Sequence, residues 1–452
     1  MKLPSVLVGV PCCAIVGFGL FGFAKNGDQK TKVAPVVPVV TVPDKVTYAE
    51  NVAPILDKHC TKCHHDDAVA PFSLVGYDNA KRQSAMVANS ASDKRMPPWK
   101  AVHGYGDFLD ENRLTDTDIA ILKKWAETGS NRGDAAKEPK PQVFNPTWEL
   151  GTPDIVLQAS KPFKLEAEGD DVYRNFVFDL HNTEPVYVTA MDVKPGNKQV
   201  VHHVIGFLDA RGRSVTLEKN NKDGQEGYTT SGGGIGVPPS GALGGWAPGV
   251  TVRKTPAGTA FVVQPGTKIV MQVHYHKDGK EETDQTKLGL YTTKVKPERQ
   301  MDIYWCAQHF FKIPVGAADQ EVTWQDTMPA DATIYYVMPH MHLLGKSMKA
   351  KVIKDDGTEV PLVFVDHWDF NWQLIYALKE PLKVKKGWKL AVEAHYDNSD
   401  DNPYKTDRPV TWGEQTTDEM ALLVVGYTAE RPITIQQMIQ QKLKDGFRRG
   451  GQ

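Results

Sequence analysis

Val337–Met348 reads VMPHMHLLGKSM and places two histidines two residues apart between apolar neighbours. On a β-strand, residues i and i+2 point to the same face, so His340 and His342 could hold one metal ion between them. Imidazole suits copper, zinc, iron or nickel rather than calcium or magnesium. A histidine pair on a half-exposed strand that binds no metal is an equally good interpretation of this stretch alone.

Other histidines and one methionine occur in similar apolar surroundings. His202 and His203 lie in VVHHVIGF, His274 and His276 lie in KIVMQVHYHKDG, and Met420 precedes ALLVV. Adjacent histidines face opposite sides of a regular strand, so His202 and His203 can share a metal only where the strand ends, twists or bulges. His274 and His276 share a face and are alternatives for a third ligand.

Together and in this order, the motifs resemble those of the copper type II ascorbate-dependent monooxygenases over residues 147–430. The strings QVHY, HLLGK and TDEM match the contexts in which that family carries its ligands. The resemblance implies two copper ions. The first would be held by His202, His203 and His274, and the second by His340, His342 and Met420.

The resemblance also implies different roles for the two sets. His340, His342 and Met420 are predicted to be catalytic, because soft sulfur favours the Cu(I) state that meets O2. The other set would store and relay one electron. His274 is preferred over His276 as its third member, because QVHY is the family context.

The sequence departs from the family where peptide-hydroxylating members recognise a carboxylate. They place an Arg two residues before the His-x-His, and an Asn and a Tyr two and four residues beyond the Met ligand. Here those positions are Met338, Leu422 and Val424. We therefore expect a small-molecule substrate that is less polar than a peptide carboxylate.

The segment Cys60-Thr-Lys-Cys63-His64 is a c-type haem attachment motif. Both thiols would bond covalently to the haem, and His64 would ligate its iron. A structural zinc site needs two more ligands at suitable spacing, and His65, Asp66 and Asp67 are too crowded to supply them. The sequence therefore predicts covalent haem c.

The haem needs a sixth ligand from the residues that follow. Met96 in KRMPPWKA is the best candidate, because a thioether raises the haem potential and two prolines keep its loop extended. A packed core methionine is the alternative for Met96 and the expectation for Met86. His65 and His103 are the runners-up. Helices are predicted at 48–59 and at 115–128, the second opened by a threonine cap.

The domain organisation follows from these motifs. The predicted fold class is multidomain, with a small all-α cytochrome c domain followed by two all-β sandwich (jelly-roll) domains, because short alternating strands separated by turns begin near Trp148. The predicted ranges are a signal peptide or membrane anchor at 1–25, an extended linker at 26–45, the cytochrome c domain at 46–132, a linker at 133–146, the sandwiches at 147–298 and 299–432, and a tail at 433–452.

The first residues predict export. A short basic start followed by the apolar run Pro4–Ala24 is typical of a secretory signal, and the run is also long enough for an anchor. We expect a periplasmic or extracytoplasmic location. Of five cysteines, Cys12 and Cys13 lie in this run, so the rest of the chain is disulfide-poor, and Cys306 is expected to be a buried small hydrophobe. A net charge of −2 gives no sign of a nucleic-acid partner.

The function predicted from the sequence is that of an exported copper-dependent monooxygenase. It would hydroxylate a C–H bond with O2, using electrons that an external donor supplies through the fused haem. The alternative is a non-catalytic haem and copper electron-transfer protein or copper-binding protein. Product formation distinguishes the two.

Overall fold

The computed structural model describes residues 41–431 except 67, 69, 141, 145–147 and 232–233, together with residues 433, 437, 440 and 441. The predicted leader or anchor at 1–25, residues 26–40 of the predicted linker and most of the predicted tail lie outside the described residues. Within the described part of the chain, no helix is both long and apolar enough to cross a membrane. The described residues from Val42 onward form one compact unit.

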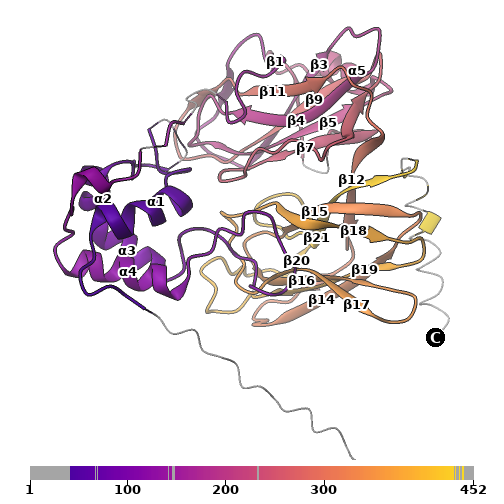
Figure 1. Ribbon diagram of the computed structural model, residues 1–452. Helices are drawn as coiled ribbons and strands as arrows, with labels where there is room; N and C mark the ends of the chain where they lie inside the picture. The colour runs from indigo at the N-terminus through magenta and orange to yellow at the C-terminus, as the bar shows by residue number, and fades with distance from the viewer. Residues whose placement is uncertain are drawn as a thin grey trace, which may run out of the picture. The chain divides into compact units, whose positions relative to one another are not determined.

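The first β-sandwich is built from β1 to β11. A five-stranded sheet has the order β6-β3-β9-β5-β7, and it packs against the strands β1-β11-β4-β8 (Figure 1). The bounds are β1 (Ile155–Gln158), β2 (Phe163–Leu165), β3 (Val172–Asp179), β4 (Val186–Lys194), β5 (Val201–Asp209), α5 (Arg213–Asn220), β6 (Tyr228–Thr230), β7 (Gly241–Trp246), β8 (Thr259–Val263), β9 (Lys268–Tyr275), β10 (Glu282–Asp284) and β11 (Lys287–Thr293).

The second sandwich is built from β12 to β21. Its four-stranded sheet has the order β14-β19-β16-β17, and it packs against β12-β21-β15-β18. The bounds are β12 (Arg299–Ala307), β13 (Lys312–Ile313), β14 (Gln320–Thr327), β15 (Ala332–His340), β16 (Gly345–Ile353), β17 (Glu359–Val365), β18 (Tyr376–Val384), β19 (Lys389–Tyr396), β20 (Val410–Thr411) and β21 (Leu422–Ala429).

The two sandwiches share one sheet. β8 and β12 pair in parallel through Arg299 with Thr259 and Gln300 with Ala260, which joins four strands of each sandwich into an eight-stranded sheet. Because β12 pairs directly with β8, the second sandwich continues one sheet of the first at its edge.

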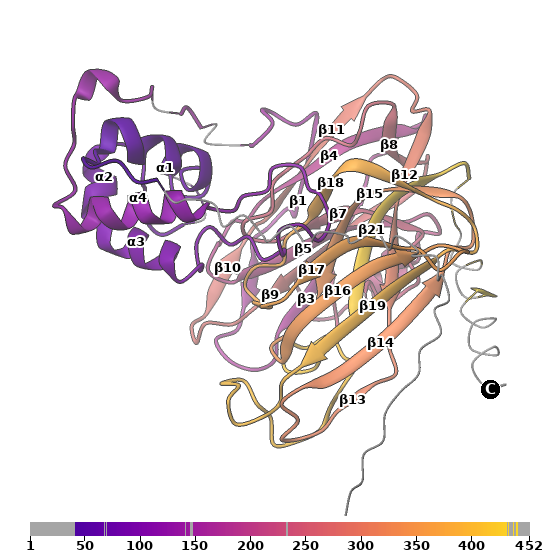
Figure 2. The same cartoon turned by 60° about the horizontal axis from the view of Figure 1, so that its bottom comes forward.

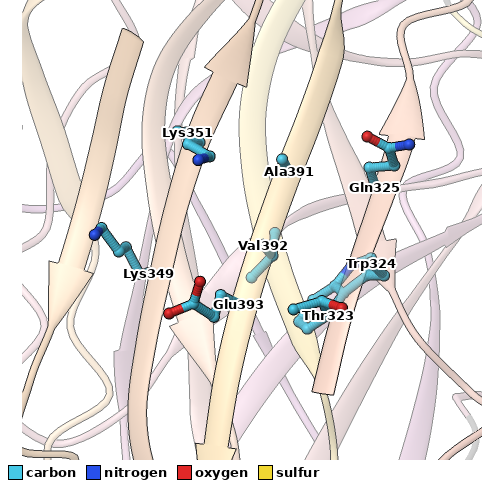
Figure 3. Close-up of a pocket in the computed structure, with 8 residues that line it drawn as sticks. All are labelled: Thr323, Trp324, Gln325, Lys349, Lys351, Ala391, Val392 and Glu393. Carbon is cyan, nitrogen blue, oxygen red and sulfur yellow. The ribbon is translucent and has the colours of Figure 1, made fainter. Parts of the chain in front are cut away.

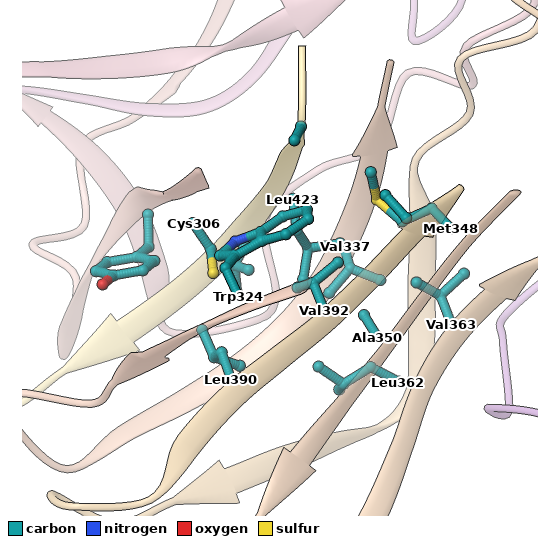
Figure 4. Close-up of a cluster of buried hydrophobic side chains, with 14 of the residues drawn as sticks. Cys306, Trp324, Val337, Met348, Ala350, Leu362, Val363, Leu390, Val392 and Leu423 are labelled. Carbon is teal, nitrogen blue, oxygen red and sulfur yellow. The ribbon is translucent and has the colours of Figure 1, made fainter. Parts of the chain in front are cut away.

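The core of the second sandwich follows from strand alternation. In Figure 4, Val337 and Leu423 point into the same apolar cluster as Trp324 and Val392 of the facing sheet. Cys306 lies there too and is fully buried, which confirms its predicted place as a small buried hydrophobe. Residues one position along β15 and β21 point to the opposite face, which carries the site described below.

Short helices gather between residues 48 and 127 (Figure 2). They are η1 (Tyr48–Val52), α1 (Ala53–His59), α2 (Tyr77–Arg82), α3 (Ser84–Ser92), α4 (Asp116–Glu127) and the single turn η2 (Ala135–Lys137) beyond them. Thr115 caps α4 in a reciprocal pair with Asp118, as the sequence predicts. Trp125 and Leu122 of α4 pack against Leu56 of α1 in a small apolar core.

The predicted fold class is wrong in its first part, because no separate small all-α cytochrome c domain is present in the described chain. The protein is mostly β-sandwich, and helices make up 14% of it. The long loop between α3 and α4 extends the second sandwich instead. Ala101 pairs with Val365 of β17, and Phe108 pairs with Leu378 of β18.

The physical reason is that this loop buries its apolar side chains outside the helices. Ala101 and Phe108 are 5% and 7% exposed and belong to the core of the second sandwich. The backbone N–H of Val102 donates to Phe364 O over 2.8 Å, so the loop also satisfies its polar groups there.

Candidate metal centres

Three histidines converge on the five-stranded sheet of the first sandwich. His203 of β5 lies directly opposite His274 of β9, and the register shifts between Val201 and His203. This irregularity lets the adjacent residues His202 and His203 face one point, which a shared metal ion requires. The Nδ1 atoms of His202 and His203 lie 3.2 Å apart, and those of His203 and His274 lie 3.3 Å apart. One potential ligand atom from each ring lies within 4.8 Å of the others.

Asp171 orients the third histidine. Nε2 of His274 donates to a carboxylate oxygen of Asp171 over 3.0 Å, which leaves Nδ1 facing the other two rings. Tyr173 stacks on the same ring at 4.2 Å. His276 bonds the other oxygen of Asp171 from an exposed position, so the structure brings His274, rather than His276, to the pair. Sequence reasoning missed Asp171, because it lies 103 residues from His274.

The charge state of these rings suits a metal. Burial lowers the pKa of His202 to about 3 and holds the pKa of His203 and His274 below the ordinary value. Burial opposes ionisation of Asp171, but hydrogen bonds from His274, His276 and Thr416 outweigh it and hold that pKa below its ordinary range. Metal ligands must be deprotonated, so neutral imidazoles beside an ionised carboxylate fit a divalent cation.

The second histidine pair straddles the end of a strand. His340 is the last residue of β15, and His342 lies beyond it, so the pair does not sit within one regular strand as expected. The rings are perpendicular, with centroids 5.3 Å apart. Nδ1 of His340 donates to Gln373 Oε1 over 2.5 Å, and Nδ1 of His342 donates to Asp418 O over 3.2 Å. Both rings therefore keep Nε2 free for a metal.

The backbone of Met420 lies near that of His342. β15 and β21 are antiparallel, with His340 opposite Leu422, and Met420 comes two residues before Leu422. The N–H groups of His342 and Met420 donate to the same carboxyl oxygen of Glu419. Met420 is 7% exposed, and Tyr396 donates to its carbonyl over 2.8 Å. Burial lowers the pKa of His340 to about 4 and that of His342 well below its ordinary value.

Glu419 holds the backbone of this second set, and sequence reasoning missed it. Its carboxylate accepts from the N–H groups of His342 at 2.8 Å, Leu344 at 2.6 Å and Met420 at 3.1 Å. The side chain is fully buried. Burial raises the pKa of Glu419 to about 8, against the lowering effect of these backbone donors.

The haem motif lines a cavity of about 720 Å³. Cys60 and Cys63 are free thiols in its wall, and His64 and Met96 line it as well. Nδ1 of His64 donates to Phe72 O over 3.2 Å, which leaves Nε2 for an iron ligand. All four predicted haem residues therefore meet at one cavity of a size typical of cofactor sites.

Other parts of the cavity wall bear on the fit. The buried indole Nε1 of Trp99 has no hydrogen-bond partner within the described structure, and a haem carboxylate would be an acceptor. Met86 also lines the cavity and is 52% exposed, so the expectation that it is a packed core methionine is wrong. Neither His65 nor His103 lines the cavity. His103 pairs instead with Glu111, with 2.9 Å between its Nδ1 and a carboxylate oxygen.

A second hollow, of about 350 Å³, lies on the four-stranded sheet. Figure 3 shows the side chains of β14, β16 and β19 around it, including Lys349, Lys351 and Glu393. The predicted ligand residues do not line it. We therefore do not associate it with the metal centres.

An apolar cluster lies next to the second histidine pair. Leu422 and Val424 are buried together with Ala307, and Met338 packs against them. Met338 lies opposite Val424, and His340 lies opposite Leu422, so all four side chains occupy one face of the sheet. The three positions at which the resemblance places polar anchors in peptide-hydroxylating members thus belong to an apolar, largely buried cluster beside His340.

The fold and these sites define a β-sandwich protein with two histidine-rich candidate metal centres. Residues 317–445 match the family model described as "Copper type II ascorbate-dependent monooxygenase, C-terminal domain". This range contains His340, His342 and Met420. The family is copper-dependent, which agrees with the chemistry of the ligand sets.

Curated relatives support the same family. The chain is 27% identical over 278 residues to "DBH-like monooxygenase protein 2" of Mus musculus, covering 55% of this chain and 40% of that protein. It is 25% identical over 178 residues to "DBH-like monooxygenase protein 1" of Gallus gallus, covering 35% and 28%. The matches span less than half the length of these relatives.

Among solved structures, the chain is similar to the infectious bursal disease virus VP2 subviral particle. The identity is 9%, the TM-score is 0.19, and the match covers 64% of this chain and 75% of that one. This likeness carries no argument about function.

Proposed function

We propose that this protein is a monooxygenase that uses two copper ions to hydroxylate a C–H bond: R–H + O2 + 2 e⁻ + 2 H⁺ → R–OH + H2O. The observation that carries the proposal is the pair of neutral ligand sets on two sandwiches, in a chain whose residues 317–445 match this copper-dependent family. Copper bound at the two sets would supply one-electron chemistry with O2.

The residues of each set have separate tasks in this proposal. His340, His342 and Met420 hold the catalytic copper, with Glu419 fixing the backbone that presents them. His202, His203 and His274 hold the electron-storing copper, with Asp171 fixing the orientation of His274. We propose that residues 147–298 hold the electron-storing copper and that residues 299–432 hold the catalytic copper.

The substrate is proposed to be a small molecule less polar than a peptide carboxylate. Met338, Leu422 and Val424 support this, because they form an apolar, largely buried cluster beside His340 in which a carboxylate would lie unpaired.

The electron supply is proposed to be a covalent haem c on Cys60 and Cys63, with His64 and Met96 as iron ligands. The shared cavity, the free Nε2 of His64 and the unpaired Trp99 indole support this group. A haem there would accept single electrons from an external donor. We propose that the protein acts outside the cytoplasm, in the periplasm or an equivalent compartment, with residues 1–25 as its signal or anchor.

The experiment begins with metal and haem analysis of the purified full chain. Two coppers and one haem resistant to denaturation are expected. Candidate substrates of graded polarity are then incubated with isotopically labelled O2 and a reductant, and products are read by mass spectrometry. A labelled hydroxyl group in apolar products supports the monooxygenase. Bound metals without oxygenated product would favour the alternative, a haem and copper electron-transfer or copper-binding protein.

A further inference from the structure

One loop, Trp368–Ile375, reaches the haem cavity and both histidine sets. Trp372, Leu374 and Ile375 line the cavity that holds Cys60 and Cys63. A few residues away in the same loop, Phe370 and Gln373 contact the candidate copper ligands. One stretch of eight residues therefore connects the haem cavity with both sets of candidate copper ligands.

Phe370 lies between the two ligand sets. Its ring stacks on His202 with centroids 4.8 Å apart and planes 13° apart. Its ring is nearly perpendicular to that of His342, with centroids 6.0 Å apart and planes at 87°. One aromatic side chain therefore contacts a ligand from each sandwich.

Gln373 provides a bonded route to the second set. Its side chain is 6% exposed, and its Oε1 accepts from Nδ1 of His340 over 2.5 Å. Its Nε2 donates to Phe370 O over 3.0 Å, which fixes the side-chain amide. The path from the cavity wall at Trp372 to His340 thus consists of one peptide unit, one side chain and one hydrogen bond.

The loop is held at several points, so these contacts are not those of a free segment. The N–H of Trp368 donates to Lys346 O over 2.9 Å, and its indole donates to His342 O over 3.0 Å. Asp369 pairs with Lys100 at 3.4 Å. Gly249 allows Trp372 to pack closely, since a Cβ there would lie 2.9 Å from the indole.

We propose that the loop Trp368–Ile375 carries electrons from the haem to the copper ions, through Gln373 to His340 and through Phe370 to His202. In each transfer one electron leaves the iron, which goes from Fe(II) to Fe(III), and converts one Cu(II) to Cu(I). The inference rests on the proposed function. Its physical basis is a contiguous chain of packed and hydrogen-bonded groups between the centres.

The test measures electron transfer directly, without substrate or O2. In the full chain loaded with haem and copper, a flavin photoreductant delivers an electron to the haem under anaerobic conditions. Haem reoxidation is followed by absorption, and loss of Cu(II) by electron paramagnetic resonance. At saturating copper, Phe370→Leu is expected to slow the loss of Cu(II) at the His202 set and Gln373→Leu the loss of Cu(II) at the His340 set, each by about tenfold and with an unchanged haem potential, because each breaks the path to its own set only.

Matched variants separate a relay from a general loss of packing. Phe370→Tyr keeps the ring, so it is expected to transfer at the parental rate. Phe364→Leu and Gln285→Leu, which alter a half-buried ring and a half-buried amide away from the loop, are also expected to match the parent.

Two outcomes overturn the proposal in different ways. Parental rates in both leucine variants, or equal slowing in the two remote controls, overturn the relay and leave the proposed function intact. A parent protein that holds both groups but passes no electron between them overturns the relay together with the proposed electron supply.

Discussion

The carboxylate of Glu419 accepts a hydrogen bond of 2.8 Å from the backbone N–H of His342. The same carboxylate binds the N–H groups of Leu344 and Met420, so one buried side chain fixes the turn after β15 and the approach to β21. The geometry of the His340, His342 and Met420 set thus depends on a residue that is not itself a proposed ligand.

Glu419→Ala is expected to destabilise the protein and empty the second copper site. Three buried N–H groups would lose their acceptor, and each unsatisfied buried group costs about 1–3 kcal/mol. Denaturant unfolding and copper content are the measurements. Glu393→Ala, at an exposed position on β19, is the control. Full copper content in the Glu419 variant would show that its carboxylate does not organise the ligands.

Asp171→Asn is expected to weaken copper binding at His202, His203 and His274. The carboxylate fixes the tautomer of His274, and loss of such a partner typically costs about 10- to 100-fold in metal affinity. Copper titration monitored by paramagnetic resonance measures this, with Asp170→Asn as the exposed neighbouring control. An affinity equal to the parent's would contradict the orienting role.

Met96→Ala is expected to lower the haem potential and remove the sulfur-to-iron absorption band, because a thioether ligand raises the potential. Met86→Ala is the matched comparison, since both methionines line the cavity. If Met86→Ala instead lowered the potential and removed the band, while Met96→Ala behaved like the parent, Met86 would be the distal ligand.

Met420→His is expected to retain copper but lose most hydroxylation. A third imidazole favours Cu(II), whereas O2 reacts at Cu(I). Copper content and product formation are measured in one preparation. Met348→Leu, a fully buried core change, is expected to leave activity unchanged. Parental product formation in the histidine variant would make Met420 a core methionine.

Asp302→Asn is expected to stabilise the protein at high pH only. Burial raises the pKa of Asp302 from its ordinary 3.8 to about 6, so the folded state binds its proton more tightly than the unfolded state. Stability is therefore lost as pH rises from about 4 to about 6, and the full cost, about 2–3 kcal/mol, is present above that. Chemical unfolding of both proteins at pH values below and above this window measures the difference. An equal gain in the free energy of unfolding at both pH values would contradict the raised pKa of Asp302.

The grouping of the candidate ligand residues was in part predictable from the sequence, because spacing along the chain encodes local chemistry. Cys60, Cys63 and His64 meet at one cavity with Met96, and His202, His203 and His274 meet on one sheet. The helix cap at Thr115 was also predictable, since capping acts between residues three apart.

Only the tertiary structure decided which distant residues support these sites. Asp171 and His274 come from different parts of the chain, and Gln373 reaches His340 from a loop 33 residues away. A spacing pattern contains no information on such contacts, because they depend on how strands pair.

The sequence by itself therefore determined the candidate ligand residues and their local order, together with the β-sandwich pattern of alternating strands. The tertiary structure decided that the predicted all-α domain is not separate, since Ala101 and Phe108 find a larger apolar core in the second sandwich than the short helices offer. It also decided that one loop, through Phe370 and Gln373, contacts both ligand sets. Apolar burial follows the available surface rather than chain order, and this is why local patterns could not predict either outcome.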